Sequence, residues 1–268
     1  MDKYAVFGNP IVQSKSPLIH RAFAGQTQQE LSYEAIFAEE DKFKERLNEF
    51  LASGGKGCNV TMPFKQQAFQ LADKLSERAQ LAEAVNTLTV DKDGKLLADN
   101  TDGAGLVADF HLNNVNLRDA RILLIGAGGA ARGVLKPLLD EKPEKLVICN
   151  RTLSKAQALA QRFASFGRIE AEEFSDIQSA FDIVINSTST SLTGGLPPVS
   201  AKIFSSNTVA YDMVYSDSAT RFNIWANDNG VALTLDGLGM LVGQAAESFL
   251  VWRGVKPEIE PVIKLLRN

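Results

Sequence analysis

Short apolar runs alternate along the chain with longer segments in which apolar residues recur every three or four positions. The first pattern is typical of strands buried on both faces of a sheet, and the second of helices with one apolar face. The first part of the chain is therefore predicted to contain strands at 4–8, 33–38 and 56–62, helices at 16–26, 41–55 and from Pro63 onward, and a hairpin over 86–100 around the Asp93-Gly94 turn signal.

A second series of strands and helices follows a helical stretch at 101–112. It comprises a strand, a glycine turn and a helix over 120–139, a strand at 145–152, a helix at 154–167, strand runs at 181–189, 208–216 and 231–237, and an apolar helix at 238–255. Apolar strands separated by helices are typical of a parallel sheet covered on both faces. The sequence therefore predicts two α/β domains, 1–102 and 103–237, with 238–268 returning to the first domain as a helical segment.

Composition narrows the class of protein. The 268 residues are 45% hydrophobic and 22% charged, which is typical of a soluble globular protein. The formal net charge of −4 lacks the basic surplus that a nucleic-acid-binding protein needs. The N-terminal residues do not form a secretory leader and no apolar run is long enough to span a membrane, so we expect a cytoplasmic protein.

The cysteines and histidines do not form a recognisable metal site or disulfide framework. Cys58 and Cys149 lie in strand-like runs, where buried reduced thiols are expected. His20 and His111 lie on predicted helices, and neither has a second metal ligand at a useful spacing. We therefore expect no bound metal and structural roles for both histidines.

The segment ILLIGAGGAARG, residues 122–133, has a G-x-G-x-x-A pattern formed by Gly126, Gly128 and Ala131. The first glycine permits a tight turn, the second lets a pyrophosphate approach the backbone, and the third small residue lets helix and strand pack closely. The start of the helix then donates N–H groups to the phosphates. The strand before and the helix after the pattern favour a dinucleotide site over a tight turn without a ligand.

The residues after the next strand indicate which dinucleotide is bound. An NAD site usually has a carboxylate there, which holds the ribose hydroxyls. This chain has Asn150, Arg151 and Thr152 instead, with Lys155 just beyond. The planar guanidinium of Arg151 can bind a 2′-phosphate, and Lys155 adds positive charge. We therefore expect NADP(H) as the cofactor.

Small polar residues gather in the first domain at positions that a core does not explain. Each follows a strand-like run or begins a helix: Ser14, Ser16, Asn59, Thr61, Asn86 and Asp102. Such positions border the ligand crevice of an open α/β sheet, although Ser16 and Asp102 can also be helix N-caps and Asn86 a turn residue. Lys65 lies in a first helical turn, where the dipole disfavours a cation, so it is either a surface lysine or a functional amine.

Several longer motifs follow one another along nearly the whole chain. They are YAVFGNPIVQSKSPLIH, GGKGCNVTMPFK, AEAVNTL, ADNTDGAGL, LLIGAGGAARGV, NRT, YDMVY and DGLGMLVGQAAESFLVWRG. Together they resemble the shikimate dehydrogenase family, and S-x-S-P, N-V-T-x-P-x-K and D-N-T-D-G are more specific than the glycine loop. The resemblance implies reversible NADPH-dependent reduction of 3-dehydroshikimate to shikimate in aromatic amino-acid biosynthesis. It also implies a substrate domain over 1–102, a Rossmann-type NADP domain over 103–237 and a central cleft.

The resemblance implies a role for each polar residue of the first domain. Lys65 and Asp102 match the family's catalytic pair, and the proton that the new hydroxyl needs comes from one of them. Helix position favours the neutral amine and an opposed carboxylate favours the ammonium, so the assignment between the two stays open. The residues that match ligands of the substrate carboxylate are Ser14, Ser16 and Tyr215, and those that match ligands of the ring substituents are Thr61, Asn86, Asp102 and Gln244, with Asn59 behind them.

On the cofactor side, the resemblance assigns three groups of residues. The phosphate loop comprises Gly126, Ala127, Gly128, Gly129 and Ala130. The clamp for the adenosine phosphate comprises Asn150, Arg151, Thr152 and Lys155. The nicotinamide end is lined by Thr188, Met213 and Gly237, although the loop reads NSTST where Asn-Ala-Thr is expected.

Two alternative functions predict other residues at these positions. A quinate/shikimate dehydrogenase that uses NAD is expected to carry an acidic residue where Asn150-Arg151-Thr152 stands. A non-catalytic NADPH-binding regulator of the same fold is expected to lack Lys65 or Asp102, and both are present. The expected partner is a small-molecule substrate, not a nucleic acid or a membrane, and a homodimer stays open.

Overall fold

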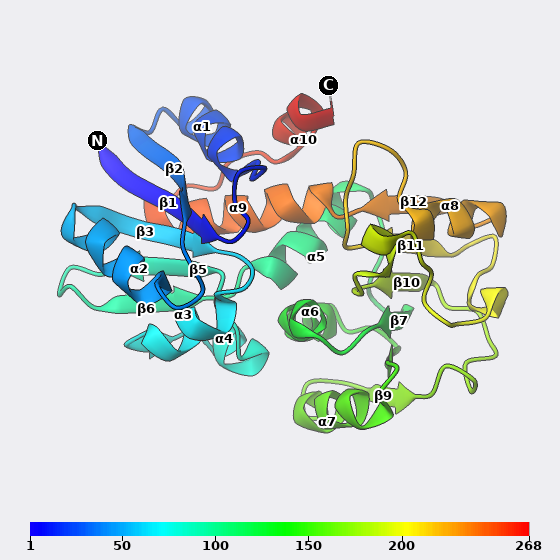
Figure 1. Ribbon diagram of the computed structural model, residues 1–268. Coiled ribbons are helices and arrows are strands. Elements are labelled where there is room, and N and C mark those ends of the chain that lie inside the picture. Colours follow the sequence, from blue (N-terminus) through cyan, green and yellow to red (C-terminus); the bar gives the residue numbers. More distant parts are fainter. Residues whose placement is uncertain (268) are drawn as a thin grey trace. The chain divides into compact units, whose positions relative to one another are not determined.

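The computed structural model describes residues 1–267 and divides into two compact units (Figure 1). Met1–Gly105 and the chain from Val242 onward form the first unit, and Leu106–Leu241 form the second. Each boundary lies within a helix, either α5 (Asp102–Leu112) or α9 (Leu238–Arg253). The first unit is therefore built from both ends of the chain.

The first unit contains a mixed six-stranded sheet in the order β2-β1-β3-β5-β6-β4. Its strands are β1 (Asp2–Gly8), β2 (Leu31–Phe37), β3 (Gly55–Val60), β4 (Lys74–Leu75), β5 (Thr87–Val90) and β6 (Leu96–Asp99). β1 pairs in parallel with β2 and β3, whereas β5 is antiparallel to β3 and to β6. β5 and β6 form the predicted hairpin, with Gly94 of its turn at φ 77°. The start of β5 thus lies at the edge where β1, β3 and β6 end.

Helices cover both faces of this sheet because its central strand is apolar on both sides (Figure 1). Successive side chains of a strand point to opposite faces. Tyr4 of β1 stacks on Trp252 of α9 at 4.6 Å between ring centroids, whereas Phe7 packs edge-on against Phe43 and Phe50 of α2 (Phe43–Ala52). α1 (Ser16–Thr27) lies on the same face as α9. The other helices of this unit are α3 (Lys65–Leu71), α4 (Glu77–Ala82) and α10 (Glu260–Arg267).

Two helices of the first unit begin at residues other than the predicted ones. α1 starts at Ser16 with Lys15 at its N-cap position, so Ser16 is not the cap. α3 starts at Lys65 and not at Pro63, because residues 61–64 form a turn in which the N–H of Phe64 donates to the carbonyl of Thr61 at 2.9 Å. Lys65 is therefore the first residue of its helix.

The second unit contains a six-stranded parallel sheet in the order β12-β11-β10-β7-β8-β9. Its strands are β7 (Arg121–Ile125), β8 (Lys145–Cys149), β9 (Ile169–Glu172), β10 (Ile183–Asn186), β11 (Val209–Asp212) and β12 (Leu233–Asp236). Counted within the unit, this order is that of the doubly wound dinucleotide-binding sheet. The predicted Rossmann-type sheet is therefore confirmed, with its topological switch point between β7 and β10.

The helices of the second unit are α6 (Gly129–Asp140), α7 (Leu153–Phe163) and α8 (Arg221–Asp228), with short 3₁₀ helices at Thr190–Thr193 and Ala201–Ile203. One face of the sheet buries Leu123, Val147 and Val184 of three neighbouring strands against Phe181 and Phe222. The elements that the pattern did not predict are β4, α4, β9 and α8, whereas α10 lies within the helical segment predicted for 238–268. No helix within residues 1–267 has the length and apolar character that crossing a membrane requires.

Candidate active site

Lys65 and Asp102 lie in direct contact, as the sequence predicts. Lys65 begins α3 and Asp102 begins α5, and Nζ of the lysine donates to Oδ2 of the aspartate at 2.5 Å. Their side chains are 31% and 11% exposed, respectively. A charge-assisted hydrogen bond of this kind contributes roughly 1.5–3 kcal/mol. An ammonium has three donors, so Lys65 can bind Asp102 and still donate to a ligand oxygen.

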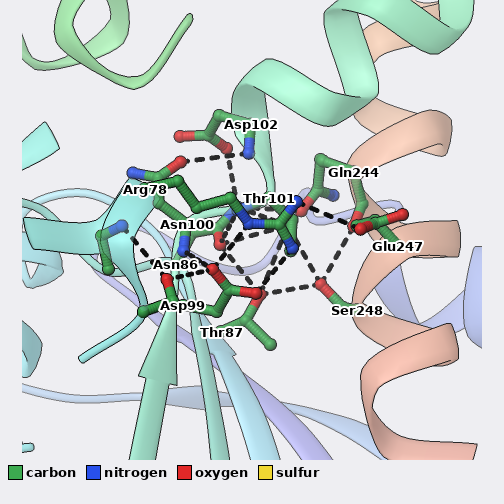
Figure 2. A network of polar contacts seen from close by, with 12 residues as sticks. Arg78, Asn86, Thr87, Asp99, Asn100, Thr101, Asp102, Gln244, Glu247 and Ser248 are labelled. Carbon is green, nitrogen blue, oxygen red and sulfur yellow. Dashed lines mark hydrogen bonds and ion pairs between the residues drawn. The ribbon is translucent and has the colours of Figure 1, made fainter. Parts of the chain in front are cut away.

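The other carboxylate oxygen of Asp102 is held by Asn86 (Figure 2). Nδ2 of Asn86 donates to Oδ1 of Asp102 at 2.8 Å and lies 3.3 Å from Oε1 of Gln244. Oδ1 of Asn86 accepts from the backbone N–H of Thr101 at 2.9 Å. Both oxygens of Asp102 therefore accept from side chains, and the carboxylate is fixed in orientation between Lys65 and Asn86. The alternative role of Asp102 as a simple helix cap does not account for these two bonds.

The sheet register explains why residues far apart in sequence meet here. Asn59 of β3 pairs with Thr87 of β5, and Thr87 pairs with Asp99 of β6. Thr61 follows β3, Asn86 precedes β5, and Asp102 follows β6, so all three lie at one edge of the sheet.

β1 ends at this same edge, and the segment after it carries Ser14 and Ser16. Oγ of Ser14 accepts from the N–H of Ser16 at 3.3 Å, and Ser16 is buried.

A second row of polar groups supports Asn86. Nδ2 of Asn59 donates to the carbonyl of Asn86 at 3.1 Å and to Oγ of Ser248 at 2.9 Å. Oγ of Thr87 donates to Oδ1 of Asn86 at 2.8 Å and lies 2.8 Å from Oγ of Ser248. The hydroxyl of Tyr33 donates to Oδ1 of Asn59 at 2.8 Å. Asn59 is thus placed behind the site, as expected.

Sequence reasoning missed Thr87 and Ser248 as parts of this network. The available signal was the spacing of polar residues on an otherwise apolar helix. Gln244, Glu247 and Ser248 of α9 are three and four positions apart, so their side chains share one face of the helix. Figure 2 shows that all three lie on the side of α9 that faces the network.

The glycine loop of the second unit has the geometry that phosphate binding requires. Gly126 has φ 113°, and a Cβ there would approach Oγ of Ser187 to 2.5 Å, so only glycine fits. Gly128 is the N-cap of α6, and a Cβ there would meet no atom within 4 Å, which leaves open space beside the backbone. Gly129 and Ala130 of the first turn are exposed, whereas Ala131 is fully buried in the predicted close packing.

The segment after β8 presents cations and no carboxylate. Arg151 and Thr152 are exposed, and Nδ2 of Asn150 donates to the carbonyl of Thr152 at 2.9 Å. Within residues 1–267, the guanidinium of Arg151 forms no hydrogen bond or ion pair, so its donors are available. Lys155 is also exposed, in the first turn of α7. This arrangement suits a phosphate group.

The ends of β10, β11 and β12 bring together the three residues assigned to the nicotinamide end. Oγ1 of Thr188 donates to Oδ1 of Asn186 at 2.6 Å, and the N–H of Met213 donates to the carbonyl of Asn186 at 2.9 Å. Gly237 packs so closely on the carbonyl of Met213 that a Cβ would overlap it. Gly126, Asn150, Thr188, Met213 and Gly237 therefore all follow carboxyl ends of parallel strands, the edge where such sheets bind ligands.

Asp212 is a further residue of this edge that sequence reasoning missed. The carboxylate is buried and accepts from Nδ2 of Asn186 at 3.1 Å and from Oγ of Ser191 at 2.6 Å. Burial raises the pKa of Asp212, although hydrogen bonds from Ser191 and Asn186 act in the opposite direction. It links the loop after β10 to the end of β11.

Tyr215 lies in the second unit, on the segment after β11, and is partly buried. Burial raises its pKa above the ordinary value of 10.0. Ser14 and Ser16 belong to the first unit. The assignment of all three residues to one substrate carboxylate stays a prediction.

The histidines and cysteines have structural surroundings. His20 is fully buried and stacks on Tyr33 at 4.1 Å between ring centroids, and burial lowers its pKa to about 3. His111 is exposed, with Nε2 3.0 Å from Oε2 of Glu141.

Burial raises the pKa values of Cys58 and Cys149 above the ordinary value, which makes both thiols unreactive. Across residues 1–267, His, Cys, Asp and Glu side chains form no group that could hold a metal ion.

Three family models match successive parts of the chain. The shikimate dehydrogenase substrate binding domain matches residues 6–88, the shikimate / quinate 5-dehydrogenase model matches residues 108–193, and the shikimate 5'-dehydrogenase C-terminal domain matches residues 237–267. The first match contains Lys65 and Asn86, the second contains the glycine loop, and the third contains Gln244.

Several known proteins match this chain over almost their full length. A shikimate dehydrogenase (NADP(+)) of Psychromonas ingrahamii is 58% identical over 268 residues, which cover 100% of this chain and 98% of the relative. The crystal structure of an Ael1 enzyme from Pseudomonas putida superposes with a TM-score of 0.96 at 46% identity, covering 100% of this chain and 99% of the other. A shikimate 5-dehydrogenase from Thermus thermophilus, solved with NADP(H) and shikimate, has a TM-score of 0.89 at 30% identity and covers 100% and 99%. The family models and these relatives show that the chain belongs to the shikimate dehydrogenase family.

Proposed function

We propose that this chain is an NADP-dependent shikimate dehydrogenase, which reversibly reduces 3-dehydroshikimate to shikimate. The observation that carries the proposal is the contact of Lys65 with Asp102, at the sheet edge where Asn86 orients the carboxylate. The identity of 58% to a relative named for this activity and this cofactor supports the choice of substrate and dinucleotide. The reaction belongs to the biosynthesis of chorismate and of the aromatic amino acids.

The reaction converts a ketone to a secondary alcohol, so a hydride must reach carbon and a proton must reach oxygen. NADPH, when bound, supplies the hydride. The chain supplies the proton, and the ammonium of Lys65 is a donor with an exposed side-chain fraction of 31%. Asp102 holds that ammonium in place by accepting its hydrogen bond, and its negative charge balances that of the ammonium. In the reverse direction the same pair receives the proton from the hydroxyl of shikimate.

The polar residues around this pair bind and orient the substrate in our proposal. Thr61, Asn86 and Gln244 bind the ring hydroxyls, together with the carboxylate of Asp102. Ser14, Ser16 and Tyr215 bind the substrate carboxylate, because hydroxyls can donate to an anion without adding charge. Asn59 keeps Asn86 in place from behind.

NADP fits the residues at the carboxyl edge of the second unit. Gly126, Ala127, Gly128, Gly129 and Ala130 form the loop and first turn that receive the pyrophosphate, and Gly128 leaves the space for it. The free guanidinium of Arg151, with Asn150, Thr152 and Lys155 near it, binds the 2′-phosphate. Thr188, Met213 and Gly237 line the nicotinamide end. The absence of a carboxylate after β8 disfavours the NAD-dependent alternative.

In this proposal the parts of the chain have separate roles, with the boundaries that the sequence predicts. Residues 1–102 bind substrate and carry the catalytic pair, 103–237 bind NADP, and 238–268 contribute Gln244 to the substrate side. A cytoplasmic location stays a prediction from the sequence, and a homodimer stays open.

The proposal is tested by following NADPH formation spectrophotometrically with the purified protein. Shikimate, quinate and buffer alone are each combined with NADP and with NAD. We expect turnover with shikimate and NADP, and much less with every other combination. Turnover that prefers quinate or NAD would support the alternative dehydrogenase, and no turnover with any pair would support a regulator.

A further inference from the structure

An arginine behind the Asp102 loop forms a part-buried ion-pair cluster with two carboxylates (Figure 2). Arg78 of α4 binds the carboxylate of Asp99 through two parallel hydrogen bonds, from Nε to Oδ1 at 2.7 Å and from Nη2 to Oδ2 at 2.6 Å. Its Nη1 donates to Oε1 of Glu247 on α9 at 3.1 Å. The three side chains are 25%, 16% and 21% exposed. The guanidinium therefore ties together α4, the end of β6 and α9.

A continuous set of hydrogen bonds leads from this cluster to the backbone of Asp102. Oδ1 of Asp99 accepts from the N–H of Asn100 at 2.8 Å. Oδ1 of Asn100 in turn accepts from the N–H of Asp102 at 3.1 Å, and its Nδ2 donates to the carbonyl of Ala84 at 3.0 Å. The carboxylate of Asp99, which also accepts from Oγ of Ser76 at 2.5 Å, is thus connected through Asn100 to the backbone of Asp102.

The charge balance of the cluster depends on Arg78. Burial opposes ionisation of Asp99, but the hydrogen bonds and charge of Arg78, together with hydrogen bonds from Ser76 and the N–H of Asn100, outweigh burial and lower the pKa of that carboxyl. Burial likewise opposes the charge of Arg78, while Asp99 and Glu247 raise its pKa. One cation is thus shared by two carboxylates. Its removal leaves two like charges close together with no counter-ion, which is a costly arrangement in a part-buried place.

We propose that Arg78 is a positioning residue for catalysis, which acts through Asp99 and Asn100 on the placement of the Asp102 carboxylate beside Lys65. This inference rests on the proposed function of the Lys65–Asp102 pair. Arg78 forms no hydrogen bond to Lys65 or Asp102 within residues 1–267, so it acts only through the turn. Displacement of a reacting group by about an ångström can cost on the order of 10²-fold in rate.

The test is a double-mutant cycle between Arg78→Gln and Asp102→Asn, with kcat measured at saturating shikimate and NADP. Arg78→Gln alone should lower kcat by about 10- to 100-fold, with an unchanged KM for NADP. In the Asp102→Asn background the same change should alter kcat by no more than about twofold, because no carboxylate remains to be positioned. Equal losses in both backgrounds, or an unchanged kcat for Arg78→Gln, would overturn the inference.

Arg253→Gln is the matched control for loss of stability. Arg253 is a part-buried arginine of α9, the helix that carries Glu247, and it binds Gln29 through Nε at 2.9 Å and Nη2 at 2.7 Å, together with Asp2. Both variants should lower Tm, and only Arg78→Gln should lower kcat. If Arg78→Gln does not fold, Arg78→Lys replaces it in the double-mutant cycle. Lysine keeps the positive charge but cannot form the two parallel hydrogen bonds to the carboxylate. Failure of the parent enzyme to oxidise shikimate would refute the proposed function, whereas an active parent with additive losses would refute only the role of Arg78.

Discussion

Nζ of Lys65 lies 2.5 Å from Oδ2 of Asp102, although the two residues are 37 positions apart in sequence. Each is the first residue of a helix, and each helix starts at the same edge of the first sheet. The opposed carboxylate offsets the unfavourable position of a lysine at a helix N-terminus. The unusual placement of Lys65 is therefore explained by its partner, and this pair is the basis of the proposed chemistry.

The preference for NADP over NAD should depend on Arg151. Arg151→Ala should weaken the binding of NADP by about 10- to 150-fold and leave the binding of NAD nearly unchanged, because only NADP carries a 2′-phosphate. Arg118→Ala is the control, since Arg118 is an exposed arginine just before β7, at the opposite edge of the parallel sheet. The dissociation constants of both cofactors are measured by titration. Equal weakening of NADP and NAD would contradict the role of Arg151.

Recognition of the substrate carboxylate is tested by one variant and one altered substrate. Ser16→Ala should reduce kcat/KM for shikimate and leave NADP binding intact, because Ser16 lies in the first unit, outside the nucleotide edge. Shikimic acid methyl ester should be a poor substrate of the parent and should lose less activity on mutation. An ester that is turned over as fast as the acid would show that the carboxylate is not recognised.

Acid stability should depend on His20. Burial lowers the pKa of folded His20 to about 3, below its ordinary value of 6.5, so the unfolded state binds the proton more readily. The free energy of unfolding should therefore fall as the pH drops below the ordinary value, by up to about 1.4 kcal/mol per pH unit from this group. His20→Phe keeps an aromatic ring for the stack on Tyr33 and removes the titration.

Urea unfolding at a series of pH values measures this effect. The parent should lose stability more steeply than His20→Phe on acidification. His111→Gln, which changes an exposed histidine, should retain the slope of the parent. Parallel curves for the parent and His20→Phe would contradict the assignment of the acid sensitivity to His20.

Much of the fold could be predicted because the strands that are buried on both faces consist of continuous apolar residues. β7, β8 and β10 are examples, and the glycine turn after β7 marks their common edge. β9 was missed because it is a short edge strand in which Ile169 and Ala171 alternate with two glutamates, so it contains no continuous apolar run. β4 has two residues and α4 has six, which is too short for a period to be visible.

The candidate site likewise contains residues that the sequence indicates and residues that it does not. Lys65, Asn86 and Asp102 belong to local motifs, so sequence reasoning identified them, and the structure brings them into contact. Arg78 lies on the short helix that the pattern missed, and its partners Asp99 and Glu247 come from segments distant in sequence. Contacts of this kind depend on sheet register and on the return of α9 to the first unit, which no local pattern encodes.

Loss of the Lys65 amine should separate chemistry from cofactor binding. Lys65→Ala should lower kcat by on the order of 10²–10⁴-fold, the range for a positioned acid–base group, and leave the Kd of NADP unchanged. Lys56→Ala is the control, because Lys56 is an exposed lysine at the opposite end of β3 from Thr61. A folded Lys65→Ala protein with the kcat of the parent would make Lys65 an ordinary surface lysine.

The coupling between Lys65 and Asp102 in kcat shows whether the two residues act as one catalytic unit. The rates of Lys65→Ala, Asp102→Ala and the double variant are compared with that of the parent, after circular dichroism and NADP titration establish that all four are folded. If the two residues act as one unit, the double variant should be far less impaired than the product of the two single losses. Losses that multiply fully would make Asp102 an independent substrate ligand or a helix cap and leave Lys65 without its partner.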